Sequence, residues 1–459
     1  MLKPTEQLTR SVIFNHPGNQ ADSYTEQCQL HWIAEAIAYA IPKVKELDIV
    51  ADFWPSMPII DRLLPRKLRH FALGPILENE GTLEGTYGVL RNIFGGDDGE
   101  CGFQEGQLGY KDGSFDNGEL VLINGDQKTI GLLQSVQQER YLEERHYEQL
   151  KWFLPVAGLF HWRTNYMDMI HDIYRGPSNC FESLDYSKVH LGAHQGYRTP
   201  FHHKEEVAIK SFNARITACF LSLLPQNLKA QGNKGVNDWI TGQDIGRGNK
   251  TAAARVRFLT TLQRIREEFF SPSQRSCGDK PVDEVFQNHV RFIQDMEVYL
   301  TLKFAIKHAD IGLIERVIVR CCLLFSGSAK SQYTQLALYL TRLLATKAAD
   351  QVLQRSLLAS MLVNCRGQQD SWFEIDRLNE HHNLVLKLLL QGRRRTSSDV
   401  TELFTRVSLT ASYCLELRYA IEDTFSQFNS IYYTLANAAT NIYYLALKLL
   451  TTIIRRPSG

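Results

Sequence analysis

A carboxylate stands where an apolar run of the sequence ends. Asp126, flanked by Gly125 and Gln127, directly follows LVLI (120–123). The run is short, β-branched and bounded by turn-forming residues, which indicates a buried strand. A carboxylate where a strand opens into a loop is well placed to bind Mg²⁺, which favours one or two carboxylates together with phosphate oxygens. The alternative interpretation of Asp126 is an N-cap for the helix that follows.

A histidine ends a second apolar run about 25 residues later. His161 directly follows WFLPVAGLF (152–160). Its imidazole could ligate a metal or orient a catalytic carboxylate. The alternative is a hydrogen-bonded core or capping histidine. The order strand, Asp126, helix, strand, His161 is that of half of a metal-dependent nuclease core of the ribonuclease H type.

A third set of chemically capable residues lies in SWFEIDRLNEHHNLVLK (371–387). On a helix, Asp376, Glu380 and Asn383 share one face, and Lys387 follows one turn later. Two carboxylates on one helix face could supply the last acidic ligand of a two-metal site. The alternative is a solvated helix face. Asp310 also begins a predicted helix, and there capping is the better interpretation.

The totals of the chain limit the partners that it can have. Its 459 residues carry 51 Lys and Arg against 50 Asp and Glu, so a surface for nucleic acid must be local. The compact basic patch is Arg393, Arg394 and Arg395, with Lys387 nearby, which is too small to indicate a nuclear signal. Nine scattered cysteines without a C-x-x-C motif favour reduced thiols inside a cell.

The ends of the chain bear on localisation. The first residues contain no apolar stretch of the secretory type, so we expect an intracellular protein that is not secreted, with the nucleus as a candidate compartment. The segment 431–454 holds one charged residue, Lys448, and is long enough to span a bilayer. Several Thr and Asn residues interrupt it, so a packed helix is preferred and a transmembrane span is the alternative.

The pattern of apolar and turn residues predicts a small α/β core and a large helical region, predominantly α overall. We expect four segments: an N-terminal helical and extended part (1–118), the α/β core (119–200), a helical insertion (201–370), and C-terminal helices that complete the core (371–459). The expected strands are 119–124 and 152–160; the expected helices are 25–46, 129–150, 162–175, 283–308, 310–325, 331–364, 371–391, 398–425 and 428–454; and 227–250 is expected to be a loop. There is no P-loop, G-x-G-x-x-G, H-E-x-x-H or G-x-S-x-G motif, and no small-molecule cofactor is indicated.

Six stretches together resemble a fungal family of unknown function whose members look like derivatives of a DNA transposase. They are LGPILENEGTLEGTYGVL (73–90), LVLINGDQKTI (120–130), WFLPVAGLFHWRTNYMDMIHDIY (152–174), FHHKEEVAIKSFNARI (201–216), HADIGLIERV (308–317) and SWFEIDRLNEHHNLVLK (371–387). The transposases that this arrangement is similar to have a ribonuclease H-like fold. In them a strand Asp is followed by a helix, a strand ending near a Cys/His motif, a helical insertion and a helix bearing Glu.

The resemblance implies roles for several residues. Asp126, His161 and Glu380, with Asp376 as the alternative acid, fit the last three positions of that order. The implied catalytic chemistry is Mg²⁺- or Mn²⁺-dependent cleavage and strand transfer of DNA, with Asp126 and Glu380 as metal ligands. Gln127 would act as a supporting residue beside Asp126.

The chain departs from that pattern at its start. Such transposases need an earlier strand Asp, and the only early candidates here are Asp48 and Asp52, which Pro55 closely follows. Neither is expected on a first core strand, so we expect an incomplete core with few strands and no activity. Two hypotheses remain: a transposase-derived protein with a nuclease-like site, and a non-enzymatic helical scaffold that binds protein or nucleic acid. They differ in whether the carboxylates converge.

Overall fold

The described part of the molecule is predominantly α-helical. The structure is a computed structural model, and it describes residues 22–49, 53–69, 76, 78–94, 110–111, 114–115, 121–144, 148–192, 199–245, 249–270, 283–328, 330–347 and 351–390. Its helices are α2 (Ser23–Ala40), the 3-10 helix η2 (Pro42–Ile49), α3 (Leu83–Phe94), α4 (Gln127–Glu139), α5 (Leu159–Tyr174), α6 (Leu184–His190), α7 (Phe201–Leu223), α8 (Gln226–Lys229), α9 (Asn233–Thr241), α10 (Lys250–Phe269), α11 (Glu284–His308), α12 (Ile311–Ser326), α13 (Ser331–Lys347), α14 (Gln351–Ser360) and α15 (Ile375–Leu390). Its strands are β1 (Tyr110–Lys111), β2 (Ser114–Phe115), β3 (Val121–Gly125), β4 (Phe153–Ala157), β5 (Leu362–Val363) and β6 (Phe373–Glu374).

The predicted strand pair of the α/β unit is confirmed. Strands β3 and β4 pair in parallel, with their register running from Val121 opposite Phe153 to Gly125 opposite Ala157. Helix α4 connects them, as parallel strands require a crossover. The amide of Gly158 donates to the carbonyl of Gly125 over 2.9 Å. The chain segments that follow the two strands therefore leave the sheet side by side.

The predicted bounds of this unit are wrong at two places. The strand expected over 152–160 ends at Ala157, because helix α5 begins at Leu159. The helix expected over 129–150 ends at Glu139. Arg140 then donates to the carboxylate of Glu148, shortly before β4, over 2.9 Å.

Glycine explains a second error, the loop expected over 227–250. That stretch contains most of α8 and all of α9. Gly232 (φ 58°) precedes α9 and Gly242 (φ 70°) follows it, so these glycines mark helix ends, where positive φ is needed. Gly235 lies inside α9, where a Cβ would come within 2.0 Å of the Leu228 carbonyl oxygen. The glycine allows α8 and α9 to pack closely.

Three other predicted helices have wrong bounds or are divided in the structure. The stretch 331–364 is divided into α13, α14 and the short strand β5, which pairs antiparallel with β6. This pairing takes Phe373 and Glu374 out of the helix expected over 371–391, so α15 begins at Ile375. The helix expected over 25–46 ends at Ala40, and η2 follows from Pro42. The expected helices 283–308 and 310–325 correspond closely to α11 and α12.

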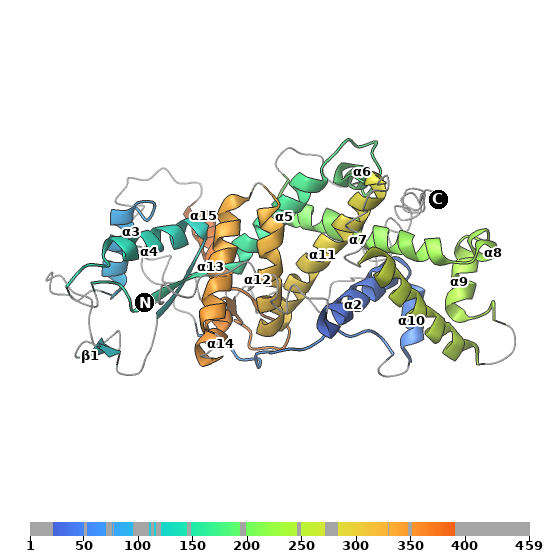
Figure 1. The fold of residues 1–459 in the computed structure, drawn as a ribbon, viewed down its shortest axis with the longest axis horizontal. Helices are drawn as coiled ribbons and strands as arrows, with labels where there is room; N and C mark the ends of the chain where they lie inside the picture. The colour runs from blue at the N-terminus through green and yellow to red at the C-terminus, as the bar shows by residue number, and fades with distance from the viewer. Residues whose placement is uncertain are drawn as a thin grey trace.

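The large apolar core extends from Cys28 on α2 to Trp372 beside β6. A small second cluster contains Val363, Cys365 and Leu378 of α15. Figure 1 shows an elongated molecule, with α3, α4 and the β3–β4 pair towards one end, α11, α12 and α13 in the middle, and α8, α9 and α10 towards the other end. The division into four segments stays a prediction. No helix within the described ranges is long and apolar enough to cross a membrane, and the segment 431–454 lies outside them.

Asp310 is a cap, as predicted, and it also fastens a distant segment. Its buried carboxylate accepts from the amide of Leu313 over 3.0 Å and so caps α12. The same carboxylate accepts from the amides of Ile60 (2.9 Å) and Asp61 (3.1 Å). It thereby ties the extended connector of residues 53–69 to the start of α12.

Replacing Asp310 should therefore cost more than replacing an ordinary helix cap. Asp310→Ala leaves three amide donors without their acceptor, and each buried unsatisfied donor costs ~1–3 kcal/mol. We expect a loss of more than ~3 kcal/mol in the free energy of unfolding, measured by urea denaturation. The matched control is Asp283→Ala, which removes one cap bond, to Phe286, from α11. It should cost only ~1 kcal/mol; equal losses in both variants would contradict the tethering role.

Candidate functional site

The site is built around a carboxylate that caps a helix from a distant part of the chain. Helix α5 begins after Gly158, which offers no side-chain cap. Asp376, on the first turn of α15, accepts from the amide of Phe160 with Oδ1 and from the amide of His161 with Oδ2, both over 3.0 Å. A carboxylate is favourable there because the first amides of a helix lack partners and carry partial positive charge. Asp376 is nearly fully buried at this junction.

Gly158 permits this contact. A Cβ on that residue would lie 2.3 Å from Oδ2 of Asp376, closer than atoms can approach. The φ of Gly158 is −75°, so the requirement comes from space and not from backbone conformation. The packing of α15 against the start of α5 thus explains the glycine at position 158, three residues before His161.

The same carboxylate fixes the orientation of His161. Oδ2 of Asp376 lies 3.0 Å from Nδ1 of the imidazole, and a carboxylate can only accept, so Nδ1 carries the proton. The other ring nitrogen, Nε2, faces Glu380, whose Oε1 is 3.9 Å away. His161 and Glu380 have 31% and 44% of their side chains exposed, so both are accessible to a ligand.

Asp126 contributes its charge to the same place. Its Oδ1 accepts from the amide of Thr129 over 2.8 Å, so the capping interpretation is confirmed. The hydrogen bond that His161 donates to Asp376 raises the pKa of the imidazole, burial opposes this, and the charges of Asp376, Asp126 and Glu380 raise the pKa further. We call Asp126, His161, Asp376 and Glu380 the acidic site. It lies where α15 packs against both α5 and the end of β3.

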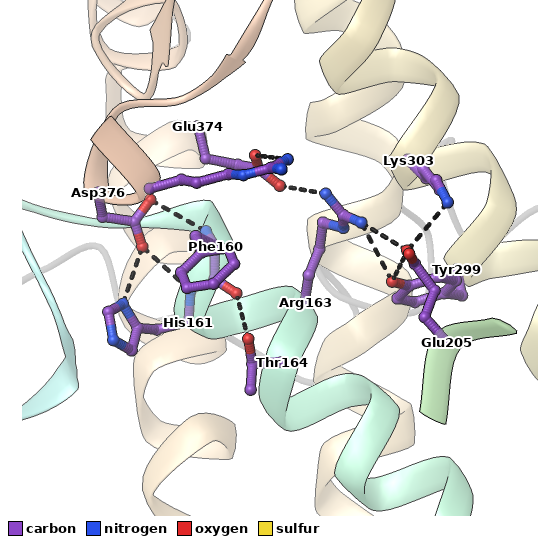
Figure 2. A network of polar contacts seen from close by, with 10 residues as sticks. Phe160, His161, Arg163, Thr164, Glu205, Tyr299, Lys303, Glu374 and Asp376 are labelled. Atoms are coloured by element: carbon purple, nitrogen blue, oxygen red, sulfur yellow. Dashed lines mark hydrogen bonds and ion pairs between the residues drawn. The ribbon is translucent and has the colours of Figure 1, made fainter. Parts of the chain in front are cut away.

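A buried ionic network adjoins the acidic site, as Figure 2 shows. Arg163, two residues after His161 on α5, pairs with the fully buried Glu374 of β6. It also donates to Glu205 of α7 over 2.6 Å. Tyr299 and Lys303 of α11 bind the same Glu205. The network holds four elements around the residues that present His161 and Asp376.

Gly158, Arg163 and Glu374 were not predicted from the sequence as site residues. One available signal was the position of Arg163, three and four residues before the buried Tyr166 and Met167 on the apolar face of α5. A cation on such a face requires a buried anion, because an unpaired charge is costly to bury. The identity of that anion, some 200 residues away, had no local signal.

The other predicted site residues have more limited roles. Gln127 is the first residue of α4, beside Asp126. Asn383 is on α15 and exposed, so the helix face that begins at buried Asp376 runs out towards solvent. Lys387 is on α15, but its side chain lies outside the described residues, as do Arg393–Arg395 entirely. The early acids are not placed either: Asp52 and the side chain of Asp48 lie outside the described part.

The acidic site does not form a closed metal-binding cluster. In the part of the chain that the structure describes, no three His, Cys, Asp or Glu side chains are placed to hold a metal ion together. Asp376 is taken up by α5. The donors that remain are carboxylate oxygens of Asp126 and Glu380 and Nε2 of His161. Carboxylates are the protein ligands that Mg²⁺ favours, one or two at a time, with water and phosphate oxygens as its other ligands.

Comparison with known proteins places the chain in a family. Residues 3–430 match the model of a family described as "Family of unknown function (DUF6589)". The chain belongs to this family. The match covers every described element, from α2 to α15. No curated protein and no solved structure matches the chain.

The titration of His161 tests the bond to Asp376. The pKa of His161 is raised above its ordinary 6.5, so its protonated form stabilises the fold. That contribution is complete below pH 6.5 and is lost as the pH rises through the raised value. A ¹H–¹⁵N NMR titration of the ring should give a midpoint above 6.5, and Asp376→Asn should lower it. Glu380→Gln should lower it less, because its carboxylate lies farther away; an unchanged midpoint in Asp376→Asn would exclude the assigned bond.

The stability of Gly158→Ala tests whether position 158 needs glycine because of the space that the Asp376 carboxylate occupies. The new methyl group must displace the Asp376 carboxylate, and such overpacking costs ~1–3 kcal/mol. The matched control is Gly131→Ala in α4, where a Cβ meets nothing within 4 Å. The control should stabilise the protein by about 1 kcal/mol through helix propensity. Thermal or urea unfolding of both variants measures this, and two changes of the same sign would refute the packing argument.

Proposed function

We propose that the chain is a transposase-derived protein whose acidic site binds a divalent cation, Mg²⁺ or Mn²⁺, and through it a DNA phosphodiester. The observation that carries the proposal is the approach of His161 to Glu380, whose Nε2 and Oε1 atoms are 3.9 Å apart, together with the charge of Asp126 acting on the same ring. The three residues lie beside the carboxyl ends of the parallel strands β3 and β4. Crevices at the carboxyl ends of strands are common ligand sites in open α/β sheets.

Each residue has a part in such a site. Asp126 and Glu380 would hold the cation with carboxylate oxygens. Asp376 would act through His161, because it keeps the proton on Nδ1 and leaves Nε2 directed towards Glu380. This carboxylate–histidine arrangement is the usual support of a metal-binding or phosphate-facing imidazole. A bound divalent cation supplies polarisation of the phosphodiester and a more acidic water.

His161 offers a second way to meet a phosphate. The surrounding carboxylates raise its pKa, so a larger share of the ring is protonated near neutral pH than in a free histidine. The protonated ring donates from Nε2 as well as from Nδ1. A phosphate oxygen is a suitable acceptor for that second proton. His161 would therefore contribute to the orientation of DNA even without a cation.

The carboxylates of this site are fewer than a complete two-metal centre uses. Two-metal phosphoryl transfer requires ions ~3.5–4 Å apart held by bridging carboxylates. Asp376 is committed to α5, and no early acid is placed at the site by the described residues. We therefore propose DNA cleavage as the ancestral chemistry and cation-dependent DNA binding as the retained one. The second candidate function is a non-enzymatic interaction scaffold, which the lack of a three-ligand cluster among the described residues favours.

Mn²⁺ binding decides between these functions. We expect Mn²⁺ to bind the full chain in a titration followed by electron paramagnetic resonance of the free ion. Asp126→Asn keeps a good helix cap and removes the charge, and Glu380→Gln removes the other ligand. Each should weaken binding by more than ~10-fold, since even residues behind the ligands contribute 10–100-fold. The control Asp185→Asn changes an acid on α6, outside the acidic site, and should leave binding unchanged.

A plasmid nicking assay with Mg²⁺ or Mn²⁺ then tests for catalysis. Cation-dependent nicking that is lost in Asp126→Asn would establish an active nuclease. Binding without nicking is the result that we expect from the carboxylates described. Absence of specific Mn²⁺ binding would overturn the proposal and leave the scaffold function.

A further inference from the structure

A separate cavity of about 340 Å³ lies between α2, the connector of residues 53–69 and the junction of α11 with α12. Its volume is within the ~300–1,000 Å³ typical of small-molecule sites. Aromatic rings dominate its lining: His31 of α2, Trp54 of the connector, and Phe304 and His308 of α11. Asp370 closes one side. None of these residues belongs to the acidic site.

The hydrogen bonds of His308 make one ring nitrogen an acceptor for a ligand. Nδ1 lies 2.5 Å from Oδ1 of Asp370 and 3.2 Å from a guanidinium nitrogen of Arg62. The carboxylate is the nearer group and can only accept, so we assign the proton to Nδ1. In the neutral ring, Nε2 is then an unprotonated acceptor. Arg62 also binds the Asp370 carboxylate.

His31 has the same arrangement on the opposite element. Its Nδ1 lies 2.9 Å from the carbonyl oxygen of Pro55, which can only accept, so Nδ1 again carries the proton. Burial lowers the pKa of both His31 and His308, so both rings are neutral near pH 7. The cavity therefore contains two neutral imidazoles, each with an acceptor at Nε2.

The charged side chains that line the cavity form hydrogen bonds within the protein. Arg62 donates to Asp370 and, over 2.9 Å, to the carbonyl oxygen of His308. The Asp310 carboxylate accepts three backbone amides. The charged side chains of the described lining, Arg62, Asp310 and Asp370, thus each have hydrogen-bond partners within the protein. The ligand that suits the cavity is therefore uncharged.

We infer that this cavity binds an uncharged planar heteroaromatic molecule that presents N–H donors, of which a nucleobase is the fitting class. The aromatic and apolar walls match flat ring faces and edges. The two Nε2 acceptors match ring and exocyclic N–H groups. The base can come from a free base, a nucleoside or single-stranded DNA, since all three share this chemistry. The inference does not depend on the acidic site or on a divalent cation.

Isothermal titration of the full chain with adenine, in buffer containing a chelator, tests the inference. We expect saturable binding to wild-type protein. N6,N6-dimethyladenine alkylated at N9 has no N–H donor and should bind at least ~10-fold more weakly, which corresponds to the ~1.4 kcal/mol of one or two hydrogen bonds. Equal binding of the two compounds, or no saturable binding of adenine, would overturn the inference.

Two variants locate the binding. His308→Phe keeps a ring and removes the acceptor, so adenine affinity should fall ~10-fold. Ile59→Trp places a large side chain in the lining from a residue that is 65% exposed, so it should abolish binding without disturbing the core. The latter variant decides the matter if His308→Phe does not fold. His190→Phe on α6 is the matched control and should bind adenine normally; undiminished binding in Ile59→Trp would also refute the site.

The source of the base is found by comparison of three ligands under the same conditions. Adenine, adenosine and a single-stranded oligodeoxyadenylate each present the same base. The ligand that binds most tightly, and loses that affinity in Ile59→Trp, identifies the source. Because these titrations contain no free divalent cation, they can fail while Mn²⁺ binding at Asp126 and Glu380 succeeds, and the reverse is equally possible.

Discussion

The arrangement of the acidic site depends on one charge–dipole contact, the carboxylate of Asp376 against the open amides at the start of α5. This contact joins α15 to α5, and with it Glu380 is brought opposite the ring of His161. The same oxygen that caps the helix also orients the imidazole. Gly158 leaves the space for it. A structural requirement of the helix and a chemical requirement of the site are thus met by a single side chain.

The buried network of Arg163 lies beside that contact and holds the surrounding elements in place. Arg163 and Glu374 are almost fully withdrawn from water, which makes each costly to bury and costly to leave alone. Glu205, Tyr299 and Lys303 supply the remaining hydrogen bonds from α7 and α11. The pair of Arg163 and Glu374 fixes the position of β6 against α5. Because α15 follows β6 directly, this also restricts the position of α15 and of its site residues Asp376 and Glu380.

Local patterns in the sequence sufficed for the parallel pair β3–β4, for α11 and α12, and for the caps at Asp126 and Asp310. They failed where the boundary of an element depends on a partner elsewhere in the chain. The local pattern of 371–374 predicts a helix, but Phe373 and Glu374 pair with β5 as a strand. The glycine-rich composition around Gly232 and Gly242 predicts a loop, because composition does not distinguish the end of a helix from a coil. For the site, the sequence offered Asp126, His161, Asp376 and Glu380 as candidates. The burial of Asp376 and the pairing of Arg163 depend on tertiary contacts and had no local signal.

The separation of His161 and Asp376 by 215 residues has a consequence during synthesis of the protein. Ribosomes add ~5–20 residues per second, so the start of α5 emerges roughly 10–40 s before its cap exists. Throughout that interval the buried Arg163 also lacks Glu374. The start of α5 therefore stays uncapped, and Arg163 stays without this anion, until residues 374–376 have been synthesised.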